Sequence, residues 1–271
     1  MSTENLTAPP PLRLLAIETS TDRMSVALGE AQPGGVLLSH DGPGAAQSSL
    51  HLLPTVERLL DQAGWSLGGL DAIVFGRGPG SFTGLRTACA VTQGLAYGAR
   101  AQGLAEGVPV LPVDTLLAVA EEARWRYADA GHDLPPAVVA LLDARMGEVY
   151  VAVYALRQGR VDPKALLAPS LCAPGALEDL LRSVDGLDCA AALWAGNVFE
   201  AYAEALAGLP SRRQVAWPTA TALLRLAPDL LGAGLAVSAH EAMPLYVRDK
   251  VAQTTDERER LRLAQQTGSV A

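Results

Sequence analysis

Two stretches of the chain share one pattern of apolar and polar positions. Residues 14–28 (LLAIETSTDRMSVAL) and 138–154 (VVALLDARMGEVYVAVY) each hold an apolar run that ends in an acid, a polar turn and then alternating apolar positions. Such runs predict buried strands, and alternation predicts a strand with one buried face. Glu18 and Asp143 take equivalent places. The repeat predicts an α/β protein with two similar domains, each opened by a β-hairpin meander, facing each other across a cleft. The alternative is that hairpins of this kind are common and the match is chance.

The spacing of apolar residues predicts further elements. Leu50, Leu53, Val56 and Leu60 recur at intervals of three and four, which is typical of a helix with one apolar face. The first half predicts strands at residues 36–40, 70–76 and 109–112 and helices at 47–63, from about 81 to 100, and at 115–130. Past Val161 we expect loops and helices near residues 175–183, 198–207 and 219–231. We place domains at 12–113 and 114–252, the last segment being able to pack back on the first domain, and expect disorder in a leader (1–11) and a tail (253–271).

A glycine-rich loop separates a predicted strand from a predicted helix in GRGPGSFTGLR, residues 76–86. Gly78 and Gly80 can adopt backbone angles closed to other residues, and Ser81 can cap the helix. Free amide groups at such a helix start commonly hold phosphate. The spacing matches neither G-x-x-x-x-G-K-[ST] nor G-x-G-x-x-G. Two interpretations stay open, a phosphate site and a tight turn.

The helix after this loop carries a stripe of small residues. Ala90, Gly94 and Gly98 stand four residues apart and therefore share one face. Each glycine costs roughly 1 kcal/mol relative to alanine in a helix. A smooth stripe lets a second helix approach closely. The second helix belongs either to residues 50–60 of this chain or to another protein.

Composition and charge narrow the function classes. The net charge is −8 and the 271 residues include only two lysines, Lys164 and Lys250, which argues against this chain holding nucleic acid alone. No run of eighteen apolar residues and no signal-peptide pattern occurs, so we expect a cytoplasmic protein without a membrane contact. The cysteines lack C-x-x-C spacing and the histidines lack metal-ligand spacing, so we predict no metal site. No nucleophile with a nearby base stands out.

Acids and hydroxyls at the strand ends suggest a second kind of site. Glu18 with Ser20, and Asp143 from the other half, offer hard oxygen ligands for Mg²⁺ beside phosphates. Together with Gly78, Gly80 and Ser81 they are candidate nucleotide-binding residues. The alternative is that acids and hydroxyls at strand ends only form turns.

Four motifs in one order carry a resemblance to a known family. LLAIETSTDRMSVAL, GRGPGSFTGLR, LLDARMGEVY and MPLYVRDKVA lie between Leu12 and about Ala252, and in them the chain resembles the bacterial TsaB (YeaZ) family. The resemblance implies the ASKHA fold of actin, sugar kinases and Hsp70. It also implies a role in making threonylcarbamoyladenosine (t6A) in tRNA.

The resemblance further implies a non-catalytic subunit. In that family the paralogue TsaD is catalytic and binds metal through a histidine pair on its first long helix. This chain has Ser48, Ser49 and His51 there, without a second histidine at the required distance. TsaB pairs with TsaD through two helices, so the expected partner interface consists of Leu50, Leu53, Val56, Leu60, Ala90, Gly94 and Gly98. The other implied partners are TsaE, tRNA only through the complex, and a second copy when the chain is alone.

The resemblance implies that the protein needs no cofactor. It leaves open that ATP or ADP binds weakly with Mg²⁺ at or near the partner interface. Glu18 stands where the family frequently has aspartate, which weakens a kinase-like magnesium site. The alternative function is an ATP-dependent phosphotransferase or hydrolase that uses Glu18 and Asp143. A metallopeptidase is disfavoured by the missing histidine pair.

Overall fold

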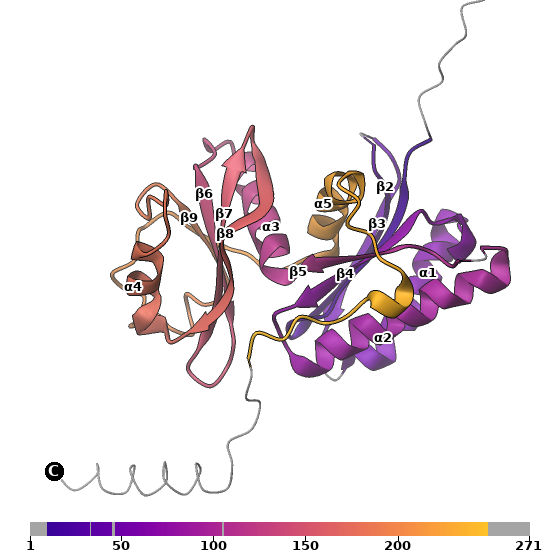
Figure 1. Ribbon diagram of the computed structural model, residues 1–271, viewed down its shortest axis with the longest axis horizontal. Helices are drawn as coiled ribbons and strands as arrows, with labels where there is room; N and C mark the ends of the chain where they lie inside the picture. The colour runs from indigo at the N-terminus through magenta and orange to yellow at the C-terminus, as the bar shows by residue number, and fades with distance from the viewer. Residues whose placement is uncertain (1–9, 33, 45–46, 105, 249–271) are drawn as a thin grey trace, which may run out of the picture.

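The computed structural model describes residues 10–32, 34–44, 47–104 and 106–248. These residues form two five-stranded sheets that stand side by side in Figure 1. The disorder expected for residues 1–11 and 253–271 falls outside the described residues, apart from residues 10 and 11. No helix in the described ranges is both long and apolar enough to cross a membrane.

The two sheets have the same internal order. In the first, β1 pairs antiparallel with β2 and parallel with β4, and the order is β3-β2-β1-β4-β5. In the second, β6 pairs antiparallel with β7 and parallel with β9, and the order is β8-β7-β6-β9-β10. This confirms the predicted duplication. The bounds are β1 Arg13–Glu18, β2 Arg23–Glu30, β3 Leu37–Pro43, β4 Ala72–Gly78, β5 Val110–Asp114, β6 Ala137–Asp143, β7 Val149–Arg157, β8 Arg160–Cys172, β9 Leu193–Gly196 and β10 Arg213–Val215.

Helices cover both faces of the first sheet, and those on its inner face also separate it from the second sheet (Figure 1). Helices α1 and α2 pack on the outer face of the first sheet, while α3 and α5 lie between the sheets. The bounds are α1 Ser48–Ala63, α2 Phe82–Gly98, α3 Thr115–Asp129, α4 Leu177–Arg182 and α5 Ala220–Gly232, with short 3-10 helices at η2 Leu67–Gly69, η3 Ala99–Gln102, η4 Pro174–Ala176 and η5 Ala239–Glu241.

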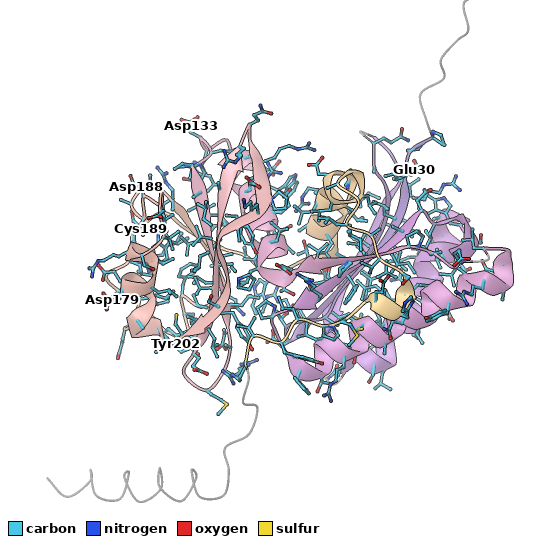
Figure 2. All side chains as sticks on the ribbon, viewed as in Figure 1. Glu30, Asp133, Asp179, Asp188, Cys189 and Tyr202 are labelled. Carbon is cyan, nitrogen blue, oxygen red and sulfur yellow. The ribbon has the colours of Figure 1, made fainter. Side chains whose placement is uncertain are left out.

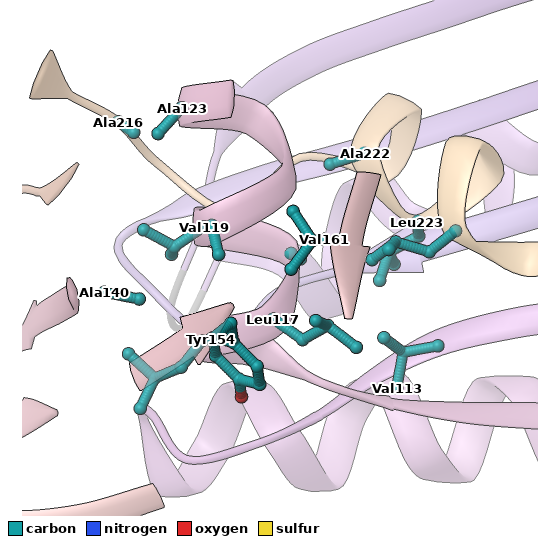
Figure 3. Close-up of a cluster of buried hydrophobic side chains, with 14 of the residues drawn as sticks. Val113, Leu117, Val119, Ala123, Ala140, Tyr154, Val161, Ala216, Ala222 and Leu223 are labelled. Atoms are coloured by element: carbon teal, nitrogen blue, oxygen red, sulfur yellow. The ribbon is translucent and has the colours of Figure 1, made fainter. Parts of the chain in front are cut away.

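Strand β1 shows how the apolar runs build these layers. Leu15 and Ile17 join the outer core under α1 and α2, whereas Leu14 and Ala16 join the central core with α3 and α5. Successive strand side chains point to opposite faces, so a strand covered on both sides must be apolar throughout. Figure 3 shows part of the central core, in which Leu117 of α3, Leu223 of α5 and Tyr154 of β7 gather.

The second half differs from the sequence prediction in two ways. Strands β8, β9 and β10 stand where we expected loops, and residues 198–207, expected to form a helix, form successive turns. Pro163 and Pro169 made β8 hard to predict, because proline within a run argues against a strand. They are tolerated because β8 is an edge strand. Strands β9 and β10 are too short, at four and three residues, to show a period.

The chain returns to the first sheet after β10. Helix α5 packs against β1 and β2, and Val237 pairs with Val110 at the edge of that sheet. The domain boundaries at residues 113 and 252 stay a prediction.

Candidate functional site

A cavity lies where the four sequence motifs meet. Its volume is about 560 Å³. Its walls come from the β1–β2 turn, the start of α2, the β6–β7 hairpin and the last described residues of the chain. The lining residues are Ser20–Asp22, Gly80–Thr83, Leu85, Leu142–Met146, Tyr150, Asn197, Trp217 and Leu245–Arg248.

The structure brings four of the six candidate nucleotide-binding residues to this cavity. Ser20, Gly80, Ser81 and Asp143 line it. Glu18 and Gly78 do not. The backbone of Gly78 has a φ of 119°, and a Cβ there would lie 2.5 Å from the carbonyl oxygen of Leu245. The missing side chain at Gly78 therefore lets the backbone at Leu245 come close.

The glycine-rich loop packs against the β1–β2 turn. The amide of Ser81 donates to the carbonyl oxygen of Ser20 at 2.6 Å. A Cβ at Gly80 would overlap that carbonyl, and a Cβ at Gly84 would overlap the carbonyl oxygen of Thr19. Ser81 caps α2, as predicted, by accepting from the amide of Gly84 at 3.4 Å. These contacts favour the tight-turn interpretation, because the glycines make room for the protein's own backbone.

Glu18 is buried behind the cavity. Its side chain is packed over Gly76, and its Oε1 accepts from the amide of Ser20 at 2.6 Å. Its other oxygen, Oε2, is buried without a hydrogen-bond partner among the described residues. Burial raises the pKa of Glu18 to about 7, against the opposing effect of hydrogen bonds from Ser20 and Thr19. Within the described ranges no group of three or more His, Cys, Asp and Glu side chains is placed to hold a metal ion.

Glu18→Gln is expected to flatten the pH dependence of stability. The folded state holds this proton up to a pKa of about 7, against the usual 4.5. The stabilisation is therefore complete below pH 4.5 and is lost as the pH rises through 7. The amide variant carries no such proton, so the difference in the free energy of unfolding between pH 5 and pH 8 should shrink by on the order of 3 kcal/mol. Urea titrations at both pH values measure this; equal differences in both proteins would show that Glu18 is ionised throughout.

The carboxylate of Asp143 is engaged in hydrogen bonds at the β6–β7 hairpin. One carboxylate oxygen, Oδ1, accepts from the amide of Arg145 and from the hydroxyl of Tyr202, both at 2.8 Å. Burial, and then the hydrogen bond to Asp143, raise the pKa of Tyr202 to about 12. Tyr202, labelled in Figure 2, belongs to the turns between β9 and β10. The carboxylate therefore shapes the hairpin beside the cavity.

Several cavity residues were not predicted from the sequence. No catalytic or ligand-binding motif pointed to Asn197, Trp217 and Tyr246. These residues line the cavity from distant parts of the chain. Only the family motif around Tyr246 offered a signal.

The predicted partner surface is only partly accessible. Leu50 and Leu53 are 70% and 44% exposed. Val56 and Leu60 instead lie in the outer core, because they face the sheet side of α1, and this corrects their assignment to the interface. The remaining members, Ala90, Gly94 and Gly98, are exposed.

The small-residue stripe has no internal partner in the described structure. A Cβ built on Gly94 or Gly98 meets no described atom within 4 Å beyond its own surroundings in the helix. Helix α1 therefore does not cover the stripe. We call the exposed residues Leu50, Leu53, Ala90, Gly94 and Gly98 the α1/α2 face.

The duplicated sheets and the cavity between them define an α/β protein of the ASKHA type, the class that the sequence motifs implied. Residues 43–255 match the family model TsaD, described as tRNA N6-adenosine threonylcarbamoyltransferase.

Relatives along nearly the whole chain are more specific. Proteins of Escherichia coli (strain K12) and Haemophilus influenzae (strain Rd), both described as tRNA threonylcarbamoyladenosine biosynthesis protein TsaB, are each 32% identical over 89% of this chain and over 96% and 95% of their own length. The solved structure of YeaZ from Pseudomonas aeruginosa is 36% identical, covers 87% of this chain and 99% of its own, and has a TM-score of 0.69. The chain belongs to the TsaB (YeaZ) family.

Proposed function

We propose that this protein is a non-catalytic subunit of the complex that makes t6A in tRNA. In this proposal the α1/α2 face binds the catalytic subunit TsaD, and the pair together binds the ATPase TsaE. The protein acts in the cytoplasm and meets tRNA only through the complex. The names of the relatives and the match to the TsaD family model support the pathway.

The observation that carries the proposal is the open small-residue stripe. Two glycines inside α2 cost roughly 2 kcal/mol of helix stability. Gly94 and Gly98 have open space beside them in the described structure. Leu50 and Leu53 on α1 add exposed apolar surface. Helix packing from another protein accounts for both features, because small side chains allow close approach and leucines then bury apolar area.

The state of the acids supports a non-catalytic role. Glu18 is 1% exposed and does not line the cavity. Asp143 accepts two hydrogen bonds at Oδ1, and its Oδ2 pairs with Arg145 at 3.4 Å. A phosphate-binding magnesium site needs carboxylate oxygens that are free to coordinate the ion. Glu18 Oε2 has no described partner but is buried and does not line the cavity, so neither acid offers a free carboxylate oxygen there.

A second candidate is an ATP-dependent phosphotransferase or hydrolase. It is favoured by Ser20, Gly80, Ser81 and Asp143, which line one cavity at the start of a helix. Calorimetry of the purified chain with ATP and Mg²⁺, followed by a phosphate-release assay, separates the two candidates. We expect weak binding or none, and no turnover; tight binding with turnover favours the enzyme.

Mass measurement with and without TsaD tests the proposed partner. Light scattering after size-exclusion chromatography should show one species with the summed mass of both chains when they are mixed. Two separate peaks at micromolar concentration would contradict the proposal. The chain alone also reveals whether it forms a homodimer.

A further inference from the structure

The fourth sequence motif has no part in the proposed function, yet it lies across the cavity. Residues 242–248, which we call the strap, follow η5, run along α2 and end beside the β6–β7 hairpin (Figure 1). The last four residues, Leu245 to Arg248, line the cavity. The strap therefore connects the two halves of the molecule at the site where the other three motifs meet.

The first part of the strap is fastened to the first half. The carbonyl oxygen of Ala242 accepts from Cys89 Sγ at 3.2 Å and from Gln93 Nε2 at 2.9 Å, both on α2. The amide of Leu245 donates to the carbonyl oxygen of Arg77 at 2.7 Å. These bonds hold the strap at more than one point along its length.

Aromatic contacts extend this attachment toward the cavity. The rings of Tyr246 and Phe82 lie 4.7 Å apart, and the guanidinium of Arg86 stacks on Phe82. Arg86 also donates to the Tyr246 hydroxyl at 3.4 Å. The strap is thus bound to the glycine-rich loop and to the helix that follows it.

In the described part of the chain, the hydrogen bonds from the far end of the strap to the second half come from Arg248. Arg248 Nη2 donates to Glu148 Oε2 at 2.5 Å and to the carbonyl oxygen of Ala144 at 3.1 Å. The side chain of Arg248 is only 15% exposed. Charge-assisted bonds of this kind are stronger than neutral ones. The other terminal nitrogen, Nη1, donates to Met146 Sδ at 3.2 Å, so both ends of the planar guanidinium contact the hairpin, whereas a lysine would offer a single nitrogen.

We propose that the strap is a latch across the cavity and that Arg248 keeps it closed. The strap has several bonds to the first half but depends on Arg248 for the described bonds to the hairpin. Releasing Arg248 removes the described hydrogen bonds between the strap and the β6–β7 hairpin, while Ala242 stays attached to α2. This local opening would widen the cavity on the side that the strap lines.

The two halves stay joined when the latch opens. Arg225 on α5 donates to Glu121 at 3.0 Å and to Glu122 at 2.6 Å, and both acids are buried on α3. Hydrogen bonds from Arg126, Arg225 and Thr219 outweigh burial and lower the pKa of Glu122, so this acid is charged at neutral pH. The opening is therefore confined to the strap and the cavity walls.

Amide hydrogen exchange of the full chain tests the latch, because exchange reports local opening residue by residue. Arg248→Ala should speed exchange of the strap, with the Leu245 amide as reporter, at least tenfold. Amides of β1 and β9 should change less than twofold. Arg248→Lys should fall between, and Arg182→Ala, which removes an exposed guanidinium paired with Glu178, is the matched control and should change nothing.

Two outcomes overturn the latch. Unchanged exchange of the strap in Arg248→Ala shows that Arg248 does not hold it, and an equal rise in both sheets shows that Arg248 serves overall stability. If Arg248→Ala does not fold, Glu148→Gln tests the same contact with the arginine in place. It should speed strap exchange at least threefold, and no change again overturns the proposal.

Discussion

Gly94→Leu should abolish stable binding of TsaD while leaving the isolated chain folded. The leucine side chain would fill the stripe into which a partner helix packs, and overpacking of such a contact is unfavourable. A loss of about 3 kcal/mol corresponds to roughly a hundredfold weaker complex. The fold is spared because the position is open among the described residues. Calorimetric titration of TsaD measures the affinity, and thermal unfolding of the variant alone checks its stability.

Gly94→Ala is the matched control for this prediction. Alanine keeps the stripe small, so the complex should keep its affinity within about threefold, a change well under 1.4 kcal/mol. Unchanged affinity in Gly94→Leu would place the TsaD interface elsewhere on the molecule.

A second large effect is expected for Gly84→Ala in the same helix. A Cβ at Gly84 would overlap the carbonyl oxygen of Thr19, and the two residues are also joined by the bond from Thr19 Oγ1 to the Gly84 carbonyl, at 2.7 Å. The obstacle is backbone, so a side-chain rotation cannot remove it. We expect a loss of about 3 kcal/mol in the free energy of unfolding, measured by urea denaturation.

Gly98→Ala gives the comparison within α2. Apart from its chain neighbours and the helix's own backbone, no described atom lies within 4 Å of a Cβ built there, so the better helix propensity of alanine should raise stability by up to about 1 kcal/mol. Equal effects of the Gly84 and Gly98 variants would mean that α2 does not pack on the β1–β2 turn in this way.

The duplicated fold could be predicted because its strands carry their own signal. Strands β1 and β6 are buried on both faces, and their apolar runs ending in Glu18 and Asp143 are visible without knowledge of the contacts. Strand β8 gave no such signal. It is an edge strand that contains two prolines and alternates irregularly between exposed and half-buried positions.

The partner surface could be predicted only in outline. An apolar residue on an amphipathic helix faces either the core or a partner, and periodicity groups Leu53 with Val56 and Leu60. Only the packing of α1 on the sheet separates the exposed Leu53 from the two buried residues. Gly94 and Gly98 were informative in a different way, because glycine destabilises a helix and its presence there indicates a packing role even before the contacts are known.

The cavity could not be assembled from the sequence beyond its motifs. Glu18 and Ser20 are two residues apart, yet only Ser20 lines the cavity, because β1 ends at Glu18 and the period of two within a strand no longer relates the side chains of the following turn. Trp217 and Arg248 reach the cavity through contacts with residues far away in the sequence: Arg23 lies 4.1 Å from the Trp217 ring, and Arg248 bonds to Glu148.

Formation of t6A on an unmodified tRNA, with the small-molecule substrates of the pathway supplied, tests the central claim most directly. Three reactions are compared: this chain alone, TsaD with TsaE, and all three proteins. We expect no product from the chain alone and a large increase in product when it joins TsaD and TsaE. Product from the chain alone, or an equal yield with and without it, would contradict a non-catalytic subunit that supports TsaD.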